Sequence, residues 1–116
     1  CKVYGSNLHV KVPIYPPYRY PDITAVCGDR IFEDFFGLRV LVNPLLIIEV
    51  LSPSKQSFDL NLNFTYYKSI ESFTEYLLID QEKPHVVLYT KQSADAWLQR
   101  EFNSLEDKIY LSSIDC

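Results

Sequence analysis

The sequence contains no methionine, so its 116 residues do not begin at an initiator residue and indicate a processed chain or a piece of a longer one. It also lacks an apolar run of about 20 residues and an N-terminal basic region followed by an apolar stretch, so neither a membrane span nor a secretory signal is expected. No repeat or low-complexity tract divides it. Because 47% of the residues are hydrophobic, we expect one soluble, cytoplasmic domain over residues 1–116 with no membrane partner.

Cysteine and histidine are scarce. Cys1, Cys27 and Cys116 show no CxxC spacing, which predicts neither a disulfide scaffold nor a zinc site, and Cys27 is interpreted as a thiol in the core. His9 and His85 are far apart in the sequence, which favours strand or surface positions over metal ligation.

Positive charge is in deficit, with 11 Lys and Arg against 15 Asp and Glu and a formal net charge of -4. Binding of nucleic acid through bulk charge requires a concentrated basic surface, so this composition argues against that mode. Basic residues nevertheless gather in the first part of the chain and leave a local basic face open. They are Lys2, Lys11, Arg19, Arg30 and Arg39.

Alternating and short apolar segments predict a sheet. Strands are expected at 8–12, 22–27, 45–51, 75–79, 85–90, 97–102 and 109–111. The segment 45–51 is aliphatic and bounded by Pro44 and Pro53, which is typical of an interior strand covered on both faces. Prolines make a regular element unlikely at 16–21, so we expect none there.

A helix is predicted over residues 59–70, where Leu60, Phe64 and Tyr67 follow one another at spacings of four and three. The segment 31–41 mixes aromatic and acidic residues and is interpreted as a loop with a helical turn. The order of strands, one helix and further strands predicts an α+β (α/β) domain dominated by a mixed sheet.

Glu49 lies at the end of four consecutive aliphatic residues. Burial of an unpaired carboxylate is costly, so the acid must be neutralised, paired, solvated at a strand end or bound to a cation. Asp22 opens the strand 22–27, and the two acids can converge at one edge of the sheet if these strands are neighbours. Because Mg²⁺ is commonly held by one or two carboxylates plus substrate phosphate, a metal site is one interpretation, and an ion pair with lysine or simple solvation is the other.

Several short motifs resemble the Uma-two family when taken in order. They are Tyr20-Pro21-Asp22, the string NPLLIIEVLSPS from Asn43 to Ser54, Phe58-Asp59, Tyr66-Tyr67 and EYLLID from Glu75 to Asp80. The resemblance runs from about Lys2 to Cys116. Members look like bacterial restriction endonucleases of the PD-(D/E)XK fold. The resemblance therefore implies a restriction-endonuclease-like mixed sheet. It also implies a metal-dependent endonuclease that acts on nucleic acid, in particular DNA.

The resemblance also implies roles for individual residues. Asp22 and Glu49 would ligate Mg²⁺ or Mn²⁺, the Val50 carbonyl would complete the shell, and a lysine would orient the attacking water. The usual lysine position of the fold is Leu51 here, and the helix position at which the family commonly carries it is Asn63. Asparagine can hydrogen-bond water but supplies no positive charge.

Two lysines are candidate substitutes that would contact nucleic acid, Lys55 and Lys68, and each can also be an ordinary solvated lysine. The resemblance further implies an N-terminal helix and hairpin, with an additional acid, that this chain does not contain. We therefore expect weak metal binding with little or no DNA cleavage.

Two other interpretations stay open. The first is a non-catalytic remnant whose sheet mediates protein contact or self-association as a homo-oligomer. The second is a stacking platform for single-stranded nucleic acid, made by Tyr15, Tyr18 and Tyr20, since bases stack on aromatic rings.

Overall fold

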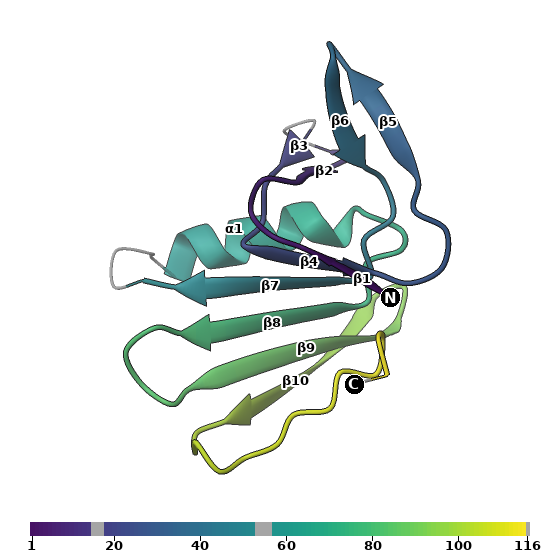
Figure 1. Ribbon diagram of the computed structural model, residues 1–116. Helices are drawn as coiled ribbons and strands as arrows, with labels where there is room; N and C mark the ends of the chain where they lie inside the picture. The colour runs from purple at the N-terminus through teal and green to yellow at the C-terminus, as the bar shows by residue number, and fades with distance from the viewer. Residues whose placement is uncertain (15–17, 53–56, 116) are drawn as a thin grey trace.

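Two β-sheets and one helix make up the described part of the chain (Figure 1). The computed structural model describes residues 1–14, 18–52 and 57–115, with the side chains of residues 57–61 left out. The larger sheet has the order β1-β4-β7-β8-β9-β10. Its strands are β1 (Lys2–Tyr4), β4 (Ile23–Val26), β7 (Leu46–Leu51), β8 (Glu75–Asp80), β9 (Val86–Ser93) and β10 (Ala96–Phe102). β7 and β8 run parallel and the other neighbours antiparallel, so the sheet is mixed, as predicted.

The smaller sheet has the order β3-β2-β6-β5 and stands above one end of the larger sheet in Figure 1. Its strands are β2 (His9–Lys11), β3 (Tyr18–Arg19), β5 (Phe32–Phe35) and β6 (Leu38–Leu41). This arrangement places β3, which ends three residues before Asp22, close to the helix.

The helix α1 (Ser57–Lys68) covers one face of the larger sheet (Figure 1). The strand alternation of β7 turns Ile47 and Glu49 toward α1 and Leu46 toward the other face. The core under the helix joins side chains of both sheets, α1 and the turn that follows it. It consists of Val10, Val12, Ile47, Tyr67, Ile70, Phe73, Tyr76, Leu78 and Val87.

The C-terminal segment, residues 103–115, covers the opposite face of the larger sheet. Ile109, Leu111 and Ile114 pack against a second core cluster that includes Leu46. Glu75, which is buried on this face, accepts a hydrogen bond from the Ser113 N–H at 2.8 Å. That hydrogen bond ties the segment to the sheet.

Three sequence predictions about local structure are wrong. The segment 31–41 forms the hairpin of β5 and β6 rather than a loop with a helical turn, because Phe36 and Gly37 both adopt positive φ angles, 50° and 82°, as a tight hairpin turn requires. Residues 109–111 form no strand, since they contribute apolar side chains to the second core without backbone pairing. Within 16–21, the pair of residues 18–19 forms β3 and pairs with β2.

The interpretation of Cys27 as a core thiol is also wrong, because Cys27 forms a disulfide with Cys1. The antiparallel pairing of β1 and β4 sets Lys2 opposite Val26. This brings together Cys1, which precedes Lys2, and Cys27, which follows Val26. A separation of 26 residues gives no sign of this pairing in the sequence. Cys116 lies outside the described residues.

The other predicted elements are confirmed to within a few residues. The strand predicted at 45–51 is β7, and it is interior to the sheet as expected. The helix predicted at 59–70 runs from Ser57 to Lys68. No helix of the described residues is long and apolar enough to cross a membrane.

Candidate active site

Asp22 and Glu49 lie on neighbouring antiparallel strands, as the metal-site hypothesis requires. The register pairs Ile23 of β4 with Ile48 of β7, and this places Asp22 opposite Glu49. Residues directly opposite one another project from the same face of a sheet, so both acids face α1. The Asp22 Oδ2 atom accepts the Val50 N–H at 2.8 Å, which fixes the position of this carboxylate against β7.

Glu49 is only 6% exposed. The Tyr67 hydroxyl donates a hydrogen bond to its Oε1 atom at 3.2 Å. Burial of the ring, followed by the neighbouring Glu49 carboxylate, raises the pKa of Tyr67 well above its ordinary value, so the phenol stays protonated. Glu49 is therefore a buried carboxylate that accepts a hydrogen bond from the protonated Tyr67 hydroxyl of α1.

A cleft of about 580 Å³ opens beside Glu49. Its walls come from β3 and the residue after it, β5, β7 and α1, so residues far apart in the sequence meet in it. The lining residues are Tyr18, Arg19, Tyr20, Phe35, Glu49, Asn63 and Tyr67. The cleft thus contains both Glu49 and Asn63, the residue that the resemblance assigned to the lysine position.

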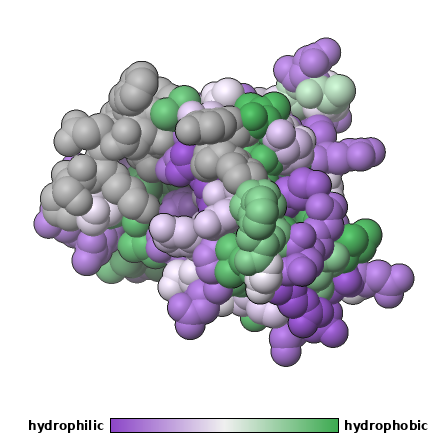
Figure 2. Space-filling model, turned by 90° about the horizontal axis from the view of Figure 1, so that it is seen from above, coloured by the Kyte–Doolittle hydropathy of each residue, from purple (hydrophilic) through white to green (hydrophobic). Residues whose placement is uncertain are grey.

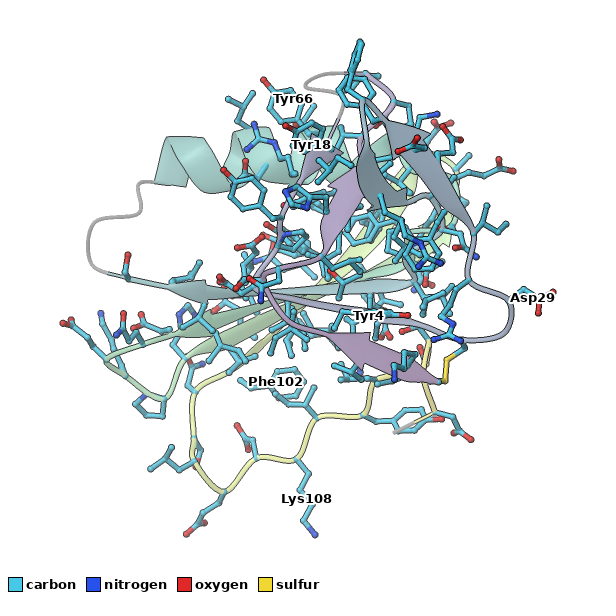
Figure 3. All side chains as sticks on the ribbon, turned by 45° about the horizontal axis from the view of Figure 1, so that its top comes forward. Tyr4, Tyr18, Asp29, Tyr66, Phe102 and Lys108 are labelled. Carbon is cyan, nitrogen blue, oxygen red and sulfur yellow. A yellow bond between two sulfur atoms is a disulfide. The ribbon has the colours of Figure 1, made fainter. Side chains whose placement is uncertain are left out.

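Arg19 is a cleft residue to which the sequence analysis assigned no role. Its guanidinium carbon lies 4.7 Å from the centre of the Tyr66 ring, where β3 meets α1, and Figure 3 shows Tyr66 and Tyr18 in this region. The Arg19 Nε atom is buried and has no hydrogen-bond partner in the part of the chain that the structure describes. In the sequence, the one indication of a role for Arg19 was its position immediately before the Tyr-Pro-Asp motif. Its position in the cleft follows from the pairing of β3 with β2, which the sequence does not reveal.

The remaining candidate residues are more dispersed. Lys68, at the end of α1, places its Nζ atom 4.2 Å from the centre of the Phe64 ring and does not line the cleft. Lys55 and Tyr15 lie outside the described residues. The Val50 side chain is exposed on the face opposite Glu49, so its backbone alone remains a candidate for the metal shell.

The donor set fits a hydrated divalent ion that shares its shell with substrate. Among the described residues, no three His, Cys, Asp or Glu side chains cluster closely enough to hold a metal ion. Mg²⁺, however, usually keeps several waters and takes one or two carboxylates. Two residues along β7 from Glu49, Ile47 lies between Thr24 of β4 and Tyr76 of β8. The hydroxyls of Thr24 and Tyr76 are buried and have no hydrogen-bond partner among the described residues. Buried hydroxyls of this kind are commonly satisfied by ordered water.

The chain matches the Uma2 family, described as "Putative restriction endonuclease", over residues 1–114. It belongs to this family. Two Synechocystis relatives resemble it. The uncharacterized protein sll1609 is 36% identical over 100 residues, which cover 86% of this chain and 56% of the relative. The uncharacterized protein slr1290 is 28% identical over 114 residues, which cover 98% and 58%. The chain therefore spans somewhat more than half the length of these two relatives.

A crystal structure from Anabaena variabilis, described as "a putative nuclease belonging to DUF820", superposes with a TM-score of 0.71. The sequences are 19% identical, and the match covers 98% of this chain and 61% of that one. At this identity the likeness shows the fold. It confirms the predicted α+β class, with mixed sheets and one helix like those of a nuclease-like neighbour.

Proposed function

We propose that this Uma2 chain hydrolyses phosphodiester bonds of nucleic acid, DNA in particular, with the help of Mg²⁺ or Mn²⁺ held at the cleft, and that it does so slowly because Asn63 supplies no positive charge. The observation that carries the proposal is the cross-strand pair of Asp22 and Glu49, of which Glu49 lines an open cleft and Asp22 lies beside it. Its membership of a family described as restriction endonucleases supports the same chemistry. The whole protein's substrate and partners are part of this proposal.

Five residues in and beside the cleft then have definite tasks. Asp22 and Glu49 hold the cation, with the Val50 carbonyl as a third candidate ligand. A bound divalent cation lowers the pKa of water and offsets charge on the phosphate. The Val50 N–H and the Tyr67 hydroxyl orient the two carboxylates, and the Asn63 amide hydrogen-bonds water or a phosphate oxygen in the cleft.

Cleavage of plasmid and of labelled oligonucleotides, with Mg²⁺, with Mn²⁺ and with a chelator, tests the proposal. Glu49→Gln and Asp22→Asn should abolish metal-dependent cleavage. Glu75→Gln is the matched control, since Glu75 is equally buried in the same sheet but faces the C-terminal segment. Cleavage that survives Glu49→Gln, or a wild type that cleaves nothing with either metal, would reject the proposal in favour of a non-catalytic role.

Asn63→Lys should raise the cleavage rate, because it restores a charge beside the acids. Loss of one such electrostatic stabiliser typically costs about 10²–10³ in rate, which bounds the gain from above. Thr65→Lys adds the same charge at an exposed position of α1 and is the control. Equal rates in both variants would show that the Asn63 position does not serve the reaction.

Self-association is the second candidate, and the edge of the larger sheet favours it. β10 is the last strand of that sheet and pairs with β9 alone among the described strands. Such an edge can add a strand from another copy. Figure 2, which looks down on α1 and the smaller sheet, shows hydrophobic areas that are small and scattered outside the grey atoms, so this face is the weaker candidate. Light scattering that shows a monomer at every concentration would reject self-association.

A further inference from the structure

We propose that the cleft takes an unpaired nucleotide of a single-stranded nucleic acid, with its phosphate on Arg19 and its base stacked on Tyr20. This substrate class rests on the proposed nuclease function of the same cleft. Beyond that function, we assign single-stranded rather than duplex nucleic acid to the cleft and name two residues that bind it.

The guanidinium of Arg19 packs on the Tyr66 ring but has no hydrogen-bond or ion-pair partner among the described residues. Its buried Nε atom has no hydrogen-bond partner within residues 1–14, 18–52 and 62–115, and no ion pair to these residues involves the guanidinium. A buried donor that makes no hydrogen bond costs free energy, and an anionic ligand in the cleft would offset that cost. Arginine offers a planar fork of donors that matches phosphate, and the Tyr66 ring, 4.7 Å from the guanidinium carbon, restricts its orientation.

The composition of the cleft favours stacking over bulk charge. Among the seven described residues that line it, Arg19 and Glu49 carry opposite charges, whereas four are aromatic. Duplex binding relies on several phosphate contacts, and the chain has a net charge of -4. Stacking of unpaired bases on aromatic rings needs little charge.

Tyr20 is the exposed ring at the mouth of the cleft. It is 64% exposed, and it lies 5.2 Å from the His9 ring, nearly perpendicular to it. Tyr18 contacts the same His9 ring in the same manner. The two tyrosines therefore project from one side of this extended segment, while Arg19 between them reaches Tyr66 on the other. A nucleotide bound along residues 18–20 can therefore contact the Tyr20 ring with its base and the Arg19 guanidinium with its phosphate.

Fluorescence anisotropy without divalent metal measures binding separately from hydrolysis. The probes are short oligo-dT, oligo-U and a hairpin duplex of matched length. Both single strands should bind more tightly than the duplex. Tyr20→Ala should weaken binding of the single strands roughly tenfold, as expected for one stacked base, and Tyr20→Trp should restore it. Tyr110→Ala removes another exposed tyrosine, on the C-terminal segment, and should change nothing.

Salt dependence identifies the contribution of Arg19. Arg19→Ala should weaken binding and reduce the slope of log K against log salt by about 0.7, the value for one phosphate contact to a single strand, whereas Tyr20→Ala should leave the slope unchanged. Arg100→Ala, which removes an exposed arginine of β10, is the control. Binding of the duplex as tight as that of the single strands, or Arg19→Ala and Tyr20→Ala variants that behave like their controls, would overturn the inference. Neither result depends on cleavage, so a chain that binds single strands but hydrolyses nothing would refute the nuclease proposal alone.

Discussion

Glu49 combines near-complete burial with a position in the wall of an open cleft. The Tyr67 hydroxyl satisfies one of its oxygens, and the opposite strand places Asp22 beside it. An acid in this environment is stable only when its acceptors are used, which is why its partners are the best place to perturb the site.

Tyr67→Phe should lower the free energy of unfolding by about 1–3 kcal/mol, because it removes a donor to a buried carboxylate. Tyr76→Phe removes the same hydroxyl group and is the control. The Tyr76 hydroxyl is buried with no hydrogen-bond partner among the described residues, so its removal should lower the free energy of unfolding by less. Urea denaturation of the two variants measures the difference. Equal losses would show that the hydrogen bond to Glu49 contributes nothing to stability.

The same two tyrosines predict a dependence of stability on alkaline pH. Burial, followed by the nearby Glu49 carboxylate, raises the pKa of both Tyr67 and Tyr76 in the folded chain, whereas in the unfolded chain tyrosine ionises near pH 10. Their contribution is therefore complete below about pH 10 and is lost above it, by about 1.4 kcal/mol per pH unit for each residue. Urea unfolding in this range, compared with the Tyr67→Phe/Tyr76→Phe double variant, tests this. An unchanged alkaline slope in that variant would contradict it.

Among the elements, the hairpin of β5 and β6 contributes Phe35 to the cleft and depends on an unusual turn. Phe36 has a φ of 50° although it carries a bulky side chain, and Gly37 has a φ of 82°. Asparagine and glycine tolerate these angles best.

Phe36→Asn should therefore stabilise the protein, and Gly37→Ala should destabilise it by about 1 kcal/mol. Thermal unfolding measures both, and Gly5→Ala, at a glycine without positive φ, is the control. Destabilisation by Phe36→Asn would mean that contacts of the exposed ring outweigh the strain of the backbone.

The elements also show which parts of the fold can be predicted from the sequence. β7 was predictable because proline flanks and aliphatic residues define an interior strand on their own, and α1 because its apolar residues recur at helical spacing. The hairpin was missed because its turn carries Phe36 in place of Asn or Asp, so the usual signal was absent. Arg19 was missed because its place in the cleft depends on the long-range pairing of β3.

At the scale of the whole molecule, the disulfide links the two strands at one end of the larger sheet, β1 through Cys1 and β4 through Cys27. Reduction should lower the free energy of unfolding by about 3 kcal/mol, since it releases the unfolded chain from a closed loop of this length. Denaturant unfolding with and without reductant measures the loss. The Cys27→Ser variant should not respond to reductant, and an equal response in that variant would contradict the assignment.

The central claim is that Asp22 and Glu49 together hold a divalent cation at the cleft. Anomalous difference density from crystals of the protein grown with Mn²⁺ tests it most directly, because it locates the ion without reference to activity. The account predicts a single strong peak within ligand distance of both carboxylates, absent from Glu49→Gln crystals and retained in Glu75→Gln crystals. Density elsewhere on the protein, or none beside Glu49 at saturating Mn²⁺, would contradict it.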